Sequence, residues 1–106
     1  MADLKLVGKP TSYDGDEDRW QEWSYTTKAY LIMAGLASGT WLNRLSRWET
    51  AVDEEEIPEQ FREHSRAVYY ILAMLCKGRA LTIIRTVPEG NGFESWRRLC
   101  RRWRRP

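Results

Sequence analysis

The sequence has few of the residues from which active sites and metal centres are built. It contains one histidine, His64, and two cysteines, Cys76 and Cys100. A structural zinc site needs four ligands at recognisable spacings, and these three residues cannot supply them. The sequence also has no glycine-rich phosphate loop and no serine or cysteine in a nucleophile motif. We therefore expect no enzymatic activity, no catalytic residue, no metal, no cofactor and no small-molecule substrate.

Long apolar runs and secretion signals are lacking as well. The longest apolar run, residues 68–76, is about half of the ~18 residues that a membrane-spanning helix needs. The N-terminus has no signal-peptide layout, and the sequence contains no N-glycosylation sequon. The two cysteines fall on predicted helices, which favours buried thiols over a disulfide. We expect a cytoplasmic protein without a membrane partner.

Tryptophan and charge are the features that stand out. Six tryptophans in 106 residues offer a large buried area to a single core of this size. The net charge is only +2, but residues 1–63 carry 7 Lys or Arg against 13 Asp or Glu, and residues 64–106 carry 10 against 2. Such a chain can attract copies of itself head to tail, or present a basic face to nucleic acid.

Apolar periodicity predicts one helical domain over residues 1–106. Residues 1–15 form an extended lead, and residues 16–104 form the helical core. Within this core, apolar residues recur at steps of three and four. The expected helices are residues 17–36, 41–48, 58–77, 79–86 and 93–104. The fold class is therefore all-α, a compact bundle of about five helices with a short extended N-terminal segment. We expect the third helix to be the most central.

The last helix has the clearest pattern. Its aromatic and apolar residues face one way and its arginines the other. The residues expected to form the core signature of the domain are Trp20, Trp23, Tyr30, Leu31, Leu72, Leu75, Phe93, Trp96, Leu99 and Trp103.

Three motifs in this order resemble the capsid region of Gag proteins from LTR retrotransposons of the copia and gypsy types. The first is the lead at residues 9–16, followed by a Trp-x-x-Trp pair at residues 20–23 and Tyr-Leu at residues 30–31. The second runs from residue 70 to residue 84 and is similar to the I-x-x-x-L-x-G-x-A helix pair. The third is the closing helix from residue 92, where Trp103 stands in place of the usual Tyr or Phe.

The resemblance implies one lobe of a two-lobed capsid, the N-terminal one, with a second lobe expected C-terminal to this chain. Such lobes self-associate into oligomers or shells that package RNA, so the working parts would be surfaces. The Cys-Cys-His-Cys knuckles of Gag nucleocapsids are absent from the sequence. Any RNA contact is therefore expected from the arginines near the C-terminus.

Two sets of residues are the candidates for these surfaces. The expected assembly interface consists of Trp41, Trp48, Tyr69 and Tyr70. The expected RNA-binding residues are Arg97, Arg98, Arg101, Arg102, Arg104 and Arg105. The acidic loop at residues 53–56 could also pair with the arginine helix of another copy, which would steer orientation more than hold the contact.

Other interpretations remain open from the sequence. The surplus aromatics could simply fill the core, and the arginines could be a solvated helix end favoured by the helix dipole. A domesticated Gag lobe could act as an adaptor that grips partner peptides in a groove between helices. The chain could also be a small RNA-binding helical domain that uses its C-terminal arginines.

Overall fold

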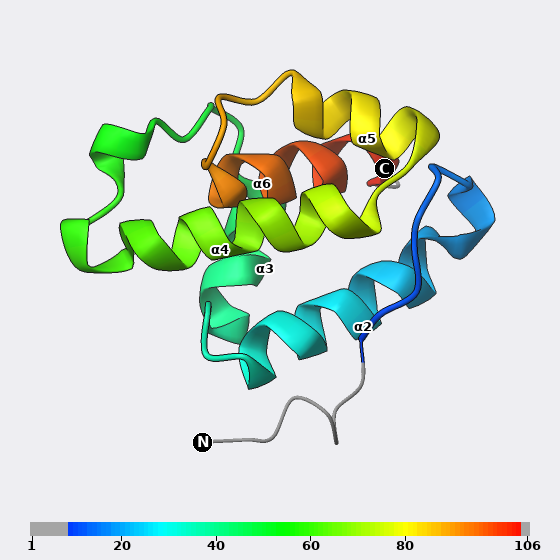
Figure 1. The fold of residues 1–106 in the computed structure, drawn as a ribbon, viewed down its shortest axis with the longest axis horizontal. Helices are drawn as coiled ribbons and strands as arrows, with labels where there is room; N and C mark the ends of the chain where they lie inside the picture. Colours follow the sequence, from blue (N-terminus) through cyan, green and yellow to red (C-terminus); the bar gives the residue numbers. More distant parts are fainter. Residues whose placement is uncertain (1–8, 105–106) are drawn as a thin grey trace.

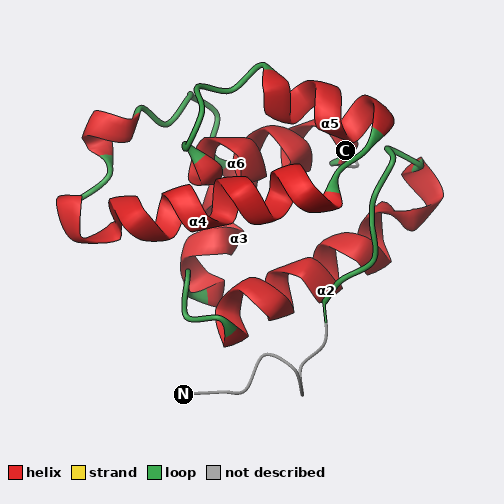
Figure 2. Cartoon of the chain, in the orientation of Figure 1, coloured by secondary structure: helices red, strands yellow, loops and turns green. Residues whose placement is uncertain are grey.

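The computed structural model of the protein describes residues 9–104. The chain folds into five α-helices (Figures 1 and 2), in the order α2 (Trp20–Met33), α3 (Gly39–Arg47), α4 (Glu59–Leu75), α5 (Gly78–Arg85) and α6 (Gly92–Trp103). Two 3-10 turns, η1 (Glu17–Arg19) and η2 (Glu54–Glu56), precede α2 and α4. The predicted all-α bundle is confirmed, and no β-strand occurs between residues 9 and 104. Residues 1–8 of the expected lead, and Arg105 of the expected RNA-binding set, lie outside the described residues.

Short polar side chains cap the first turns of two of the helices. The Ser38 side chain accepts a hydrogen bond from the backbone amide of Trp41, which satisfies one of the free donors at the start of α3. Asn91 does the same for the amide of Glu94 at the start of α6. These caps explain why α3 and α6 begin within two residues of the bounds that periodicity predicts.

The most central helix is α6, not α4 as the sequence pattern indicates. α6 packs against α3, α4 and α5, and it lies behind α4 in Figure 1. Its residues 92–97 are all buried, a longer run than any amphipathic stripe would bury. α4 buries only Ser65, Val68, Tyr69 and Leu72. The N-terminal end of α4 is less well covered, and Phe61 on it is 44% exposed.

Gly92 allows α4 and α6 to approach closely. A Cβ atom at this position would overlap the carbonyl oxygen of Ser65 and the amide nitrogen of Tyr69. The contact is completed by the Phe93 amide, which donates to the Ser65 hydroxyl at 3.1 Å. Only glycine fits there without moving one backbone away from the other.

Tryptophans from α2 and α6 meet in one aromatic cluster. The ring centroid of Trp20 lies 5.5 Å from that of Trp103 and 6.4 Å from that of Trp96. Tyr13, from the lead, stacks on Trp23 at 4.8 Å and meets Trp103 edge-on at 5.2 Å. Because aromatic side chains bury large areas, this cluster accounts for much of the core of a small domain.

The described part of the lead docks on its own domain. The Tyr13 amide donates to the Leu75 carbonyl at 2.8 Å, and the Lys77 amide donates to the Tyr13 carbonyl at 2.7 Å. The Trp23 indole donates to the Thr11 carbonyl at 2.7 Å. Burial raises the pKa of the Tyr13 phenol to about 12, and nearby Asp16 and Asp14 add to the effect. An aromatic ring thus pins the extended segment against the end of α4.

Nine of the ten residues of the expected core signature are buried. Leu75 is the tenth; it is half-buried and packs against the core. Between residues 9 and 104, none of the helices has the length and apolarity that a bilayer crossing requires.

Candidate interaction surfaces

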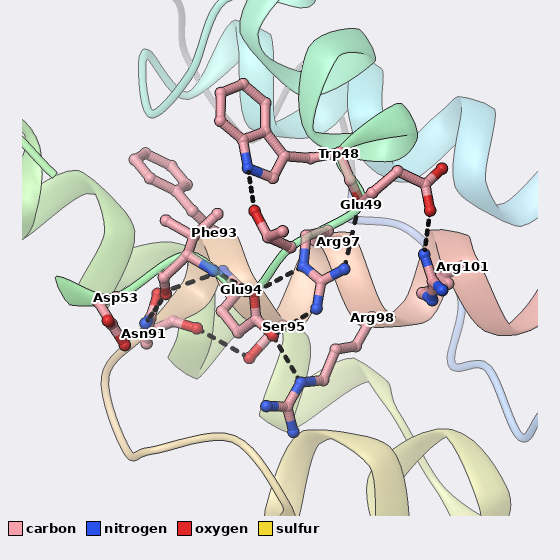
Figure 3. Close-up of polar contacts among 12 residues, drawn as sticks. Trp48, Glu49, Asp53, Asn91, Phe93, Glu94, Ser95, Arg97, Arg98 and Arg101 are labelled. Atoms are coloured by element: carbon pink, nitrogen blue, oxygen red, sulfur yellow. Dashed lines mark hydrogen bonds and ion pairs between the residues drawn. The ribbon is translucent and has the colours of Figure 1, made fainter. Parts of the chain in front are cut away.

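Arg97 does not lie on the solvent face of α6, where the sequence pattern places it. Its side chain is buried against Glu94 (Figure 3). Arg97 Nε donates to Glu94 Oε1 at 2.7 Å, and a terminal nitrogen donates to Oε2 at 2.9 Å. The other terminal nitrogen donates to the Trp48 carbonyl at 3.2 Å. All these donors are satisfied within the domain, so Arg97 stabilises the fold and does not face the solvent, where it could contact RNA.

Glu94 is a buried carboxylate that joins two parts of the chain. Besides Arg97, it accepts a hydrogen bond from Arg98 Nε at 2.6 Å and one from the Val52 amide at 2.8 Å. Burial alone would raise the pKa of Glu94, but the hydrogen bonds from Arg97, Val52 and Arg98 outweigh it and lower the pKa. The carboxylate is therefore ionised in the folded protein at neutral pH.

The same network fixes the loop between α3 and α4 (Figure 3). The Asn91 side chain donates to the Val52 carbonyl at 2.8 Å, while the Val52 amide donates to Glu94. Both polar backbone groups of Val52 are thus held by the start of α6. Sequence reasoning missed this role of Glu94. The available signal was its spacing of three and four residues from Arg97 and Arg98 on one helix.

The remaining arginines of α6 lie nearer the solvent. Arg98 is half-buried and also donates to Thr86. Arg101 and Arg104 are exposed and share Glu49, with nitrogen–oxygen distances of 2.9 and 3.6 Å. The guanidinium of Arg102, also exposed, lies 5.2 Å from the centroid of the Trp103 ring. Among the described residues of the expected RNA-binding set, only these three present exposed guanidinium groups.

The acidic loop pairs with none of these arginines within its own molecule. Its residues 54–56 form the exposed turn η2, and Glu56 accepts a hydrogen bond from the Asp53 amide. Glu49, not the acidic loop, is the carboxylate that faces Arg101. The pairing of residues 53–56 with another copy stays a prediction.

An apolar groove opens between the end of α2, α3 and the start of α4. Its volume is about 500 Å³. We call it the aromatic groove; its apolar lining residues are Leu36, Ala37, Trp41, Ile57, Pro58, Phe61 and Phe93. Trp41 meets Phe93 edge-on at 5.7 Å, and Trp48 meets Trp41 at 6.5 Å while remaining 41% exposed. Phe61 has the spacing of a core residue of α4, yet nothing among the described residues covers it fully.

A second apolar patch lies on the outer side of α4. Tyr70 is 45% exposed and Met74 is 72% exposed, and they are four residues apart on one face. We call this pair the outer patch. Tyr70 comes nine positions after Phe61, so the two side chains leave α4 about half a turn apart. Of the expected assembly residues, Trp41 lines the groove and Trp48 packs on Trp41 without lining it, Tyr70 belongs to the outer patch, and Tyr69 is buried in the core.

The two cysteines and the possible metal ligands of the described residues were the remaining candidates for a chemical site. Cys76 and Cys100 are buried free thiols, as the sequence predicts. Burial raises the pKa of each thiol to about 12, so neither is a reactive thiolate at neutral pH. No three His, Cys, Asp or Glu side chains between residues 9 and 104 are grouped closely enough to hold a metal ion.

Comparison of the chain with protein-family models, with curated proteins and with solved structures finds no match in any of the three.

Proposed function

We propose that the chain is a capsid-like assembly domain, a Gag-type lobe that self-associates into oligomers or shells packaging RNA. The observation that carries the proposal is the pair of apolar surfaces on opposite sides of α4. Neighbouring apolar side chains left exposed on a small domain mark surfaces that other molecules cover. Two different patches on one monomer permit a head-to-tail contact, in which the outer patch of one copy occupies the aromatic groove of the next.

A head-to-tail contact has a definite geometric consequence. Because the two sides of the contact differ, each added copy leaves one free groove and one free patch, so growth closes into a ring or continues as an open array. Tyr70 and Met74 suit the groove, since aromatic residues and methionine are enriched at the centres of interfaces. Each contact is small, which fits a shell built from many weak, repeated interfaces.

The resemblance to Gag capsid lobes supports the same proposal. It is carried by three motifs, of which the first includes the lead and the third is the closing helix. In the folded domain the first and third motifs meet in the aromatic cluster, through Tyr13, Trp23 and Trp103. The clustered side chains of the first and third motifs thus stabilise the fold, and assembly is left to the surfaces of α4 and α3.

The test is the mass of the protein as a function of concentration. Light scattering and electron microscopy from micromolar to millimolar concentration should show oligomers that grow with concentration. Phe61→Ser, which changes the groove, and the double substitution Tyr70→Ser/Met74→Ser, which changes the outer patch, should each abolish this growth. The matched control is Met33→Ser, which removes an exposed apolar side chain of α2 that lines neither surface. A wild-type chain that stays monomeric over the whole range would refute the assembly function.

The aromatic groove also favours a second candidate, an adaptor that binds a peptide. A groove with several aromatic walls and an uncovered phenylalanine can take the apolar face of a partner helix or strand. This function predicts a monomeric wild type and loss of partner binding in Phe61→Ser alone, with the outer-patch variant unaffected. The concentration series therefore separates the two candidates.

A further inference from the structure

A second hollow, of different chemistry, lies between α2, α3 and α6. Its volume is about 420 Å³. We call it the basic hollow because three cations line it: Lys28 from α2, Arg47 from α3 and Arg104, the residue that follows α6. The lining also includes Gln21, Ser24, Tyr25 and Asn43.

The charge of this hollow is unbalanced. None of the described residues that line it is acidic. Glu49, which lies 3.6 Å from Arg104, is outside the lining set and is shared with Arg101. Lys28 Nζ donates to the Asn43 side chain at 3.2 Å, so the lysine is held across the space between α2 and α3. Three like charges around one hollow create a positive potential that attracts an anion.

Tyr25 gives the hollow a second property. Its side chain is 70% exposed, and its ring lies 5.9 Å from Lys28 Nζ. An exposed aromatic ring beside cations is the arrangement with which proteins bind single-stranded nucleic acid, because bases stack on the ring while cations hold the phosphates. Gln21, Ser24 and Asn43 supply hydrogen-bonding groups for a base or ribose.

We propose that the basic hollow binds single-stranded RNA, with Lys28, Arg47 and Arg104 on the phosphates and Tyr25 stacked on a base. The inference rests on the proposed function, in that it names the RNA-contact site of the packaging domain. It differs from the site expected from the sequence, with which it shares only Arg104. A single strand is specified because the bases of a duplex are already stacked and cannot cover the Tyr25 ring.

The experiment is fluorescence anisotropy with a labelled oligouridine RNA, at protein concentrations where light scattering reports monomers. Three contacts to a single strand predict a log–log salt slope of about −2 from the hollow. The triple substitution Lys28→Gln/Arg47→Gln/Arg104→Gln should remove that part of the slope and weaken binding about tenfold or more at low salt. The matched control, Arg66→Gln/Lys77→Gln/Arg85→Gln, removes the same charge from α4, α5 and the link between them, and should change binding much less.

Tyr25 provides an independent readout that does not change the net charge. Tyr25→Ala should weaken binding about tenfold at every salt concentration, whereas Tyr25→Trp should retain it. Equal losses in the two triple variants would overturn the inference, because binding would then follow net charge alone. Absence of RNA binding by the wild type at low salt would overturn it as well.

Failure of this inference and failure of the assembly function give different results. If the chain never assembles but the hollow variants alone lose RNA, the inference holds and the assembly function fails. If the chain assembles, and RNA binding is unchanged by both the triple substitution in the hollow and Tyr25→Ala, the inference fails and the assembly function is supported.

Discussion

Replacement of Glu94 by glutamine should destabilise the domain strongly. The substitution keeps the shape of the side chain but removes its charge and one of its two acceptor oxygens. The new amide group would face the guanidinium of Arg97, so two donors would meet where a donor and an acceptor met before. Arg97 would remain buried with its positive charge unpaired.

The expected magnitude follows from that burial. Breaking a buried ion pair by removing one partner costs about 3–5 kcal/mol, much of it the penalty for the charge left behind. The Arg98 side chain is about one-third exposed, so loss of its ion pair with Glu94 costs little. We therefore expect a destabilisation at the lower end of this range, about 3 kcal/mol. For a domain of this size that corresponds to a fall in melting temperature of about 12–24 °C.

The assay is urea unfolding followed by tryptophan fluorescence, with thermal melting as a second measure. The matched control is Glu49→Gln, the same chemical change at a solvent-exposed carboxylate that also faces two arginines. It should leave the unfolding midpoint unchanged. The double substitution Glu94→Gln/Arg97→Gln should cost less than the sum of the single ones, because it leaves no buried charge unpaired. If Glu94→Gln loses less than about 1 kcal/mol, or no more than Glu49→Gln, the account of this network is wrong.

Three further predictions concern the same fold. The pKa of Glu94 is lowered in the folded state, so its contribution to the stability of the fold is complete above about pH 4.5, the ordinary value, and is lost as the pH falls further. The unfolding midpoint of the wild type should therefore decline more steeply with acid than that of Glu94→Gln. Gly92→Ala should cost about 3 kcal/mol or more in thermal unfolding because α4 must move away from α6, whereas Gly39→Ala, which meets only the tip of a side chain, should cost far less. Cys76 and Cys100 should react with a thiol reagent at pH 8 only as the protein unfolds, and rapid labelling of the native protein would contradict their burial.

The helices could be predicted from the sequence because the information is local. Apolar residues at steps of three and four, with Ser38 and Asn91 as caps, indicate where α3 and α6 begin and which side of each faces inward. The aromatic cluster was foreseeable for the same reason, since Trp20 and Trp23 lie on one stripe of α2.

The position of Arg97 could not be predicted in this way. Its burial depends on the loop after α3, some fifty residues earlier in the chain, whose Trp48 carbonyl and Val52 amide meet the first turns of α6. Periodicity reports one amphipathic face, whereas the start of α6 is enclosed on several sides by separate elements. The converse holds for Phe61, whose spacing indicates the core although no described element covers it fully.

The basic hollow was also beyond sequence reasoning. Lys28, Arg47 and Arg104 are far apart in the chain, and none belongs to a recognisable motif together with the others. The arginine-rich sequence near the C-terminus indicates only the region of α6 as the RNA-binding element. Only the packing of α2, α3 and α6 brings the three cations around one space beside Tyr25.

The central claim is that two different apolar surfaces join in a head-to-tail contact, and mixing two blocked variants tests it most directly. Phe61→Ser keeps the outer patch, and Tyr70→Ser/Met74→Ser keeps the aromatic groove. Sedimentation of each alone should give the mass of the 12.6 kDa chain, and an equal mixture should give a species of twice that mass and nothing larger. A mixture that stays monomeric while the wild type associates, or variants that associate as the wild type does, would contradict the account.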